Sequence, residues 1–163
     1  MPMVIIEGFV VCLILLVACV VGIANGAVNL VFLYEKEVQE KAVETGLITR
    51  EKIKRNQLLF MLFGMLPCWI FMICSVYWIN GARGFFEGFW QIYVIMMIEG
   101  LFDRLFIDFY WVGKTKAWII PKTEELMPYI YGKTLVMKWL GTLIGSPVLA
   151  AALSGIMMLL VKN

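Results

Sequence analysis

The stretch VIIEGFVVCLILLVACVVGIANGAVNLVFL, residues 4–33, decides the fold, because Glu7 is its only charged side chain. A membrane-spanning helix needs about 20 consecutive apolar residues, so this stretch predicts a first span with length to spare. It has no basic N-terminal region, and its apolar run is longer than that of a cleavable signal peptide. We therefore expect it to remain in the protein.

The rest of the chain has the same character. Hydrophobic residues make up 62% of the 163 positions and charged residues 16%, against about 45–50% and about 25% in an average soluble domain. A soluble chain of this length has too much surface to hide so much apolar material. Further apolar stretches at about 58–79, 85–112 and 134–161 predict three more spans. The expected fold is an all-α, four-helix membrane bundle that forms one domain over residues 1–163.

Two connecting segments are polar enough to lie outside the membrane. Residues 35–56 predict a helical hairpin that protrudes from it, with Gly46 ending one helix and Thr49 beginning the next. Residues 114–133 are too polar to span, and Thr123 there is typical of a helix start. Their apolar side chains predict a segment that lies along the membrane interface: Trp118, Ile119, Ile120, Met127, Tyr129 and Tyr131.

Basic residues are distributed unequally between the two sides. The loops that follow the first and third spans carry eleven of them: Lys36, Lys41, Arg50, Lys52, Lys54, Arg55, Lys114, Lys116, Lys122, Lys133 and Lys138. The opposite side carries Arg83 and Lys162. By the positive-inside rule both loops are predicted to be cytoplasmic and both termini non-cytoplasmic.

The third predicted span contains EGLFDRLFID, residues 99–108. In an α-helix, Glu99 and Asp103 share one face, and Arg104 and Asp108 share a second face where they can form an ion pair. A charge at the centre of a membrane helix costs about 2.5–3.5 kcal/mol, and such residues usually face a bundle interior or a water-filled cavity. Glu99 and Asp103 are therefore candidates for handling a proton, an ion or a polar substrate, with interhelical packing as the alternative.

Small and amide residues mark two further helix faces. In the first span, Gly22 and Gly26 permit close helix approach, and Asn25 and Asn29 lie near them. These amides either form interhelical hydrogen bonds or join Glu99 and Asp103 in one polar path. In the last span, Gly141 and Gly145 repeat the small-residue spacing, and proline at positions 67 and 147 predicts kinks in the second and fourth spans.

Several classes of site are excluded or disfavoured by composition. The chain has no histidine, which excludes imidazole-ligated haem, His-type zinc sites and His-based catalysis. No metal site, cofactor or catalytic residue is predicted. The sequence also lacks the concentrated basic patch that nucleic-acid binding requires. The four cysteines lie in apolar runs without C-x-x-C spacing, so we expect them to pack between helices: Cys12, Cys19, Cys68 and Cys74.

Residues Asp103 to Glu125 carry Asp-x4-Asp, Trp111, and then WIIPKTEE at 118–125. This arrangement resembles small polytopic membrane proteins of bacteria in which an Asp-rich span precedes an Ile-Pro-Gly-Thr-Glu element, with Lys122 here in the place of the glycine. The resemblance implies a bacterial inner-membrane location and no particular activity.

Three functions remain open from the sequence. The leading interpretation is a small oligomeric channel or transporter-like protein, with Glu99, Asp103, Asn25 and Asn29 along the path. The second is a non-catalytic membrane subunit or scaffold that docks a partner protein through residues 35–56. The third is a membrane enzyme in which Asp103, Asp108 and Lys114 bind a lipid-like substrate through a metal ion and a phosphate.

Overall fold

The computed structural model describes residues 2–161, which form helices and turns with no strand among them. The α-helices are α1 (Pro2–Ile23), α2 (Lys36–Glu44), α3 (Arg50–Phe60), α4 (Leu66–Cys74), α5 (Gly84–Phe102), α6 (Gly132–Leu140) and α7 (Ser146–Leu160). Three 3-10 turns are η1 (Ala27–Leu33), η5 (Lys116–Trp118) and η6 (Glu124–Leu126). Four π-helical turns are η2 (Met61–Met65), η3 (Ser75–Ile79), η4 (Asp103–Val112) and η7 (Gly141–Gly145).

Three helical columns are long and apolar enough to cross a membrane: Pro2–Ile23, Arg50–Ile79 and Gly132–Leu160. Many of their large apolar side chains are exposed, as Phe63 and Leu159 illustrate, and lipid is the solvent that suits such a surface. The all-α class is confirmed, and the three helices indicate a membrane-associated protein.

The fourth predicted span, 85–112, is not one of these three. It forms a continuous helical column from α5 through η4, but its charged side chains lower its hydropathy: Glu87, Glu99, Asp103, Arg104 and Asp108. The four-span bundle is therefore supported at three of its columns, and a membrane location for the fourth remains a prediction.

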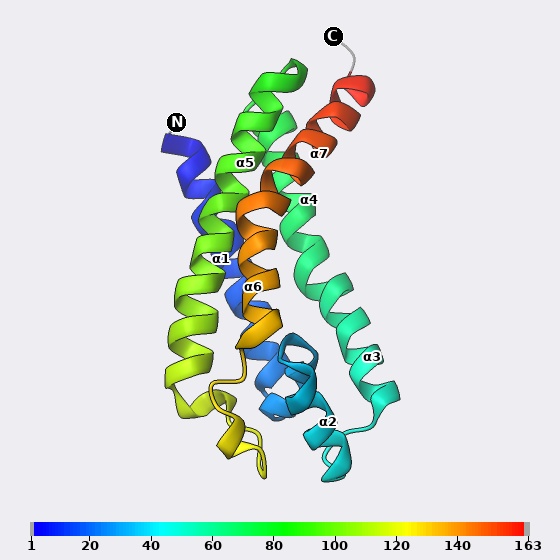
Figure 1. The fold of residues 1–163 in the computed structure, drawn as a ribbon. Coiled ribbons are helices and arrows are strands. Elements are labelled where there is room, and N and C mark those ends of the chain that lie inside the picture. Colours follow the sequence, from blue (N-terminus) through cyan, green and yellow to red (C-terminus); the bar gives the residue numbers. More distant parts are fainter. Residues whose placement is uncertain (1, 162–163) are drawn as a thin grey trace.

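The column of α5 lies between the others. It packs against α1 on one side and against α7 on the other, and α4 packs against α1. The first residues of α1 and the last of α7 lie at the same end of the bundle, and α2 and the 114–131 loop lie at the opposite end (Figure 1). We call these the termini end and the loop end. Lys162, which contributed to the predicted orientation, lies outside the described residues.

The first span is shorter than predicted. Helix α1 ends at Ile23 rather than continuing to Leu33 and beyond, and Gly26 follows with φ 110°, a conformation open to glycine but costly for other residues. The amide of Gly26 donates to the carbonyl of Ile23 at 2.8 Å. An Asn-Gly pair therefore stops the helix, and the chain turns into η1.

The predicted kinks take the form of π-helical turns. Pro67 lies at the second position of α4, directly after η2, and Pro147 occupies the same place in α7 after η7. Proline has no N–H and its ring collides with the carbonyl four residues earlier. A wider turn before the proline relieves that collision and leaves the column continuous.

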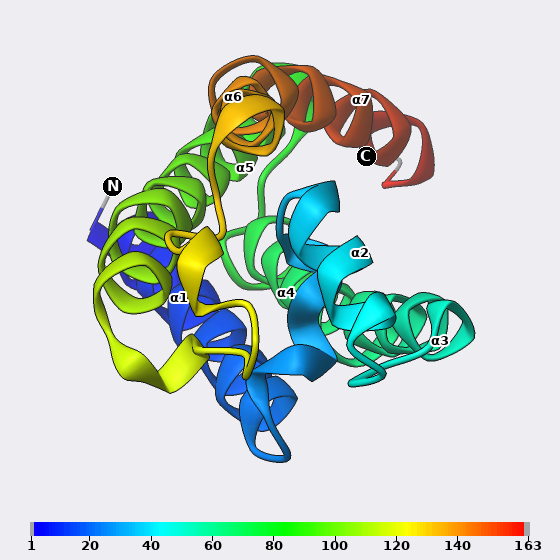
Figure 2. The same ribbon diagram turned by 60° about the horizontal axis from the view of Figure 1, so that its bottom comes forward.

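In the hairpin at 35–56, α2 packs against the bundle, whereas most of α3 is exposed, and protrusion from the membrane stays a prediction. The caps of the hairpin are confirmed: Gly46 has φ 74° just after α2, and the Thr49 side chain accepts from the Lys52 amide at 3.3 Å. Helix α2 folds beneath the bundle (Figure 2), where Val38 and Ala42 are fully buried. The alternation of apolar and charged residues in α2 reflects this one-sided burial.

The 114–133 segment also differs from its prediction. Trp118, Ile120 and Tyr129 have no exposed surface, so they are core residues rather than interfacial ones. Tyr34 packs against both Trp118 and Tyr129, with ring centroids at 6.4 and 5.0 Å. Thr123 precedes a single 3-10 turn, η6, as the predicted helix start, although its hydroxyl donates back to the carbonyl of Ile120 at 2.9 Å.

Glu35 joins the two loops. Its backbone amide donates to the carbonyl of Tyr129 at 3.2 Å, and its carboxylate accepts from the amide of Thr134 in the first turn of α6 at 3.0 Å. A carboxylate is stabilised there by the unpaired amides and the dipole of the helix. The loop end is thus a folded cap over the bundle.

Close packing of α5 against η7 gives the first prediction. A Cβ on Gly100 would lie 2.7 Å from Cγ2 of Thr142, whereas a Cβ on Gly141 or Gly155 would meet nothing within 4 Å. We expect Gly100→Ala to lower the free energy of unfolding by about 1–3 kcal/mol, measured in mixed micelles. Gly155→Ala is the matched control and should not lower it, and equal stability of the two variants would contradict this packing.

Candidate functional site

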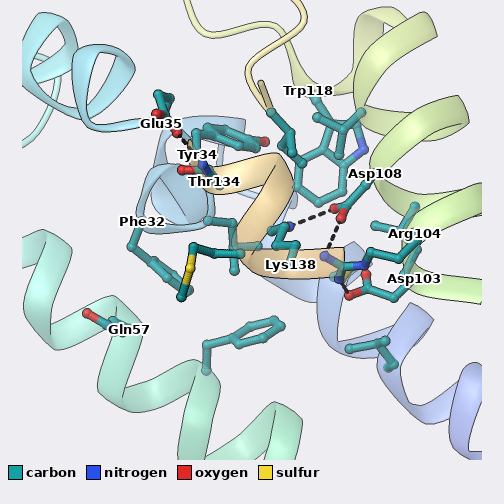
Figure 3. Close-up of a pocket in the computed structure, with 18 of the residues that line it drawn as sticks. Phe32, Tyr34, Glu35, Gln57, Asp103, Arg104, Asp108, Trp118, Thr134 and Lys138 are labelled. Carbon is teal, nitrogen blue, oxygen red and sulfur yellow. Dashed lines mark hydrogen bonds and ion pairs between the residues drawn. The ribbon is translucent and has the colours of Figure 1, made fainter. Parts of the chain in front are cut away.

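A cavity of ≈ 650 Å³ lies at the loop end, bounded by all four columns and by η1. Its lining from α5 and η4 begins at Glu99 and ends at Val112, and α1 contributes only Leu15 and Cys19. No residue of α4, α5 before Glu99, or α7 lines it. The cavity therefore occupies the loop half of the molecule, and its charged wall belongs to η4 (Figure 3).

The winding of η4 decides which side chains reach that wall. The amide of Gly113 donates to the carbonyl of Asp108, a spacing of five residues, which is the π-helical pattern. Even in a π-helix, consecutive residues such as Asp103 and Arg104 point in different directions, so the predicted division into two helix faces stays a prediction. Glu99, Asp103, Arg104 and Asp108 all line the same cavity.

Four charged groups form one network on this wall. Arg104 pairs with Asp103, and its Nη1 lies 2.8 Å from Oδ2 of Asp108, so the predicted Arg104–Asp108 pair is confirmed. Lys138 of α6 donates from Nζ to Oδ1 of Asp108 at 2.8 Å. Arg104 and Asp108 are each 7% exposed. Buried ions of this kind are stable only when paired and hydrogen-bonded, so each member depends on the others.

Glu99 stands apart from this network. Within residues 2–161, none of the four ion pairs includes it. It lines the cavity from the last turn of α5, before the winding changes. Asp103 and Asp108 are already engaged by two cations, so Glu99 is the acid left to exchange a proton or bind a cation.

Three buried donors on the cavity lining have no acceptor among the described residues: the Tyr34 hydroxyl, Nε1 of Trp118 and Nε of Arg104. Burial also raises the pKa of the Tyr34 phenol well above its ordinary value, which keeps it a donor. A buried donor without an acceptor costs roughly 1–3 kcal/mol. Each of these atoms has almost no accessible surface, so a solute with acceptor oxygens would meet them only after a local shift of the lining.

No protein-family model, no curated protein and no solved structure matches this chain.

The predicted path residues are only partly brought together. Glu99 and Asp103 line the charged cavity, but Asn25 and Asn29 line a separate hollow beside α1 and α3. There, Nδ2 of Asn56 donates to the carbonyl of Asn29 at 3.1 Å. The single polar path through all four residues is thus not the arrangement found.

The predicted packing glycines also have different surroundings. A Cβ on Gly22 would collide with the side chain of Leu30, so Gly22 does permit close approach, to η1. Gly26 forms the turn after α1. A Cβ on Gly141 would meet nothing within 4 Å, and one on Gly145 would meet only the Leu140 carbonyl of its own column. As predicted, Cys12, Cys19 and Cys68 are buried between helices, whereas Cys74 is exposed.

A second polar cluster lies toward the termini end, and the sequence did not reveal it. Asn80 donates from Nδ2 to Oε2 of Glu7 at 2.8 Å and to Oε1 of Gln91 at 2.9 Å. Glu7 is 4% exposed, and its second oxygen has no partner among the described residues. Between this cluster and the cavity, the buried side chains include Ile92 and Ile95, so apolar packing separates the two polar regions.

Lys138 is the main site residue that sequence reasoning missed, because it was counted with the cytoplasmic loop. It is a cation inside an apolar helix, and three acids against one arginine within residues 99–108 called for a further positive charge. Those two observations together could have placed it opposite Asp108.

Proposed function

We propose that this protein is a transporter-like membrane protein that binds a small polar solute in the loop-end cavity and exchanges a proton or cation at Glu99. The observation that carries the proposal is a cavity whose wall combines cationic side chains with one acid outside the ion network. Ionisable groups within membrane spans usually mark substrate pathways or proton relays.

The chemistry of the lining favours a solute with acceptor oxygens, such as a small carboxylate or phosphate. Lys36, Lys133 and Lys138 line the cavity and supply positive charge. The donors of Arg104, Trp118 and Tyr34 are covered in this conformation. Glu35 and Glu99 also line the cavity, so a solute that carries its own proton, or arrives with a cation, fits better than a bare anion.

Passage across the membrane needs a second conformation. In the present conformation, the apolar packing around Ile92 and Ile95 blocks passage from the cavity to the termini end. The Glu7–Asn80–Gln91 cluster lies beyond this packing and would be the next polar site for the solute. The π-helical turns before Pro67 and Pro147 are places where two of the columns can bend, because their backbone hydrogen bonding is already irregular. Alternate opening of the two halves would carry the solute between the polar regions.

The assembly we propose is a homo-oligomer. An added Cβ on Gly141, Gly145 or Gly155 would meet no other helix of the described chain within 4 Å, which leaves this side of the column open to a second copy. The membrane orientation that we propose places the loop end in the cytoplasm of a bacterial cell and the termini outside.

Intrinsic fluorescence tests the binding step. Small carboxylates, inorganic phosphate and glycerol are titrated into the purified protein, and we expect at least one to change the emission saturably, because Trp118 lines the cavity. Trp118→Phe should abolish the change. Trp78→Phe, which removes an exposed tryptophan remote from the cavity lining, should leave it intact. If no solute changes the emission, or if both variants lose the response alike, the cavity is not the binding site.

The enzyme alternative receives less support. Its proposed metal–phosphate set was Asp103, Asp108 and Lys114, but both aspartates are engaged by Arg104. Lys114 does not line the cavity, and its Nζ lies 5.1 Å from the ring centroid of Phe109. The scaffold alternative loses the buried face of α2 as a docking surface, and the exposed surface of α3 is what remains for it.

A further inference from the structure

A second hollow, of ≈ 1130 Å³, lies between α1, η1 and the α3–η2 column. It is separate from the charged cavity, since Phe60 is the only residue that lines both. It contains Asn25 and Asn29, the amides that the proposed function does not use. We refer to it as the α1–α3 groove.

The long part of the groove is apolar and open. On α1 its lining extends from Val10 to Gly22, and across from it lie Leu59 and Phe63. Val17, Val21 and Phe63 are more than half exposed. Twelve residues of helix rise by about 18 Å, close to the roughly 15 Å depth of hydrocarbon in one leaflet. The apolar part of the groove therefore matches the length of a lipid acyl chain.

The loop end of the same groove is polar and carries charge of one sign. Lys52 and Arg55 line it together with three amides, Asn25, Asn29 and Asn56. No aspartate or glutamate is among the lining residues, whereas the charged cavity holds four acids. Two cations and amide donors above an apolar channel are complementary to a phosphate above an acyl chain.

We propose that the α1–α3 groove binds one anionic phospholipid, with its phosphate at Lys52 and Arg55 and one acyl chain along α1. The Asn56–Asn29 hydrogen bond holds α3 to η1 and fixes the position of the polar end. This site is independent of the solute cavity, so either proposal can fail without the other.

Native mass spectrometry tests this site on the full chain in mixed micelles that contain phosphatidylglycerol or phosphatidylcholine with identical acyl chains. We expect one phosphatidylglycerol to be retained in preference to phosphatidylcholine. A basic residue near an anionic lipid contributes roughly fivefold in affinity, so Lys52→Gln with Arg55→Gln should weaken phosphatidylglycerol about 25-fold. Arg50→Gln with Lys54→Gln removes the same charge from the same helix outside the groove lining and is expected to leave retention unchanged.

A second pair of variants tests the acyl-chain position without removing charge. Val21→Trp places a large side chain in the groove and should displace the lipid, whereas Val20→Trp, on an exposed position outside the lining, should not. Three results would overturn the proposal. The first is equal retention of the two lipids by the natural chain, and the second is equal loss of phosphatidylglycerol in both double-glutamine variants. The third is displacement of the lipid by inorganic phosphate at the same concentration at which phosphatidylglycerol saturates the site.

Discussion

Glu99→Gln is expected to abolish proton-coupled uptake in reconstituted vesicles while the protein stays folded. The amide keeps the size and hydrogen bonding of the carboxyl group but cannot take up or release a proton. A neutral side chain also avoids the roughly 2.5–3.5 kcal/mol cost of a charge within the membrane, so the variant should unfold at the same temperature as the natural protein or higher. Loss of function with undiminished stability separates a working residue from a packing residue.

The measurement follows an internal pH-sensitive dye while the solute that alters Trp118 emission is added outside. Glu87→Gln is the matched control, since it neutralises an exposed acid in the first turn of the same helix, α5, and it should transport normally. Uptake by Glu99→Gln at the natural rate would remove Glu99 from the mechanism. Equal loss in both variants would point to a general effect of charge on α5.

The second large effect is expected at Asp108, which accepts from two cations. Asp108→Asn leaves Lys138 without its only ion-pair partner in the described chain and weakens the hold on Arg104. Removing one partner from a buried ion pair costs about 3–5 kcal/mol, because the remaining charge stays buried without compensation. We expect a loss of that size in the free energy of unfolding in mixed micelles.

Adding Lys138→Met to Asp108→Asn should restore much of this loss, since the uncompensated ammonium is then gone and Arg104 retains Asp103. The double-mutant cycle measures the coupling directly. The exposed Lys41–Glu125 pair, at 3.7 Å, supplies the control, because surface pairs contribute about 0–1 kcal/mol. If Asp108→Asn costs no more than Glu125→Gln, the buried network does not stabilise the fold.

Local sequence patterns predicted the parts of this fold that depend on neighbouring residues. The apolar helices, the caps at Gly46 and Thr49 and the irregular turns before Pro67 and Pro147 follow from hydropathy and backbone chemistry. The break after Ile23 was also encoded locally, in Asn25-Gly26, but the apolar residues beyond it hid the signal.

The features that the sequence did not predict depend on contacts between distant segments. Nothing near Trp118 or Tyr129 in the sequence distinguishes a membrane interface from a core, and their burial depends on Tyr34, far away in the chain. The π-helical winding of η4 could not be predicted in the same way, because no proline lies within or next to η4. The α-helical spacing assigned the charged residues correctly to one helix, but it could not show that Glu99, Asp103, Arg104 and Asp108 line the same cavity.

The most direct test of a water-filled cavity that reaches Glu99 from the loop end is cysteine accessibility. Glu99→Cys and Leu101→Cys are made in a background with the four native cysteines replaced, since Leu101 lies two residues away and is exposed on the outside of the described chain. A membrane-impermeant maleimide is then added to vesicles from either side. We predict that Glu99→Cys is labelled from the loop side only and that Leu101→Cys, surrounded by lipid, is not labelled. Equal labelling of the two positions, or none at Glu99→Cys, would contradict the cavity.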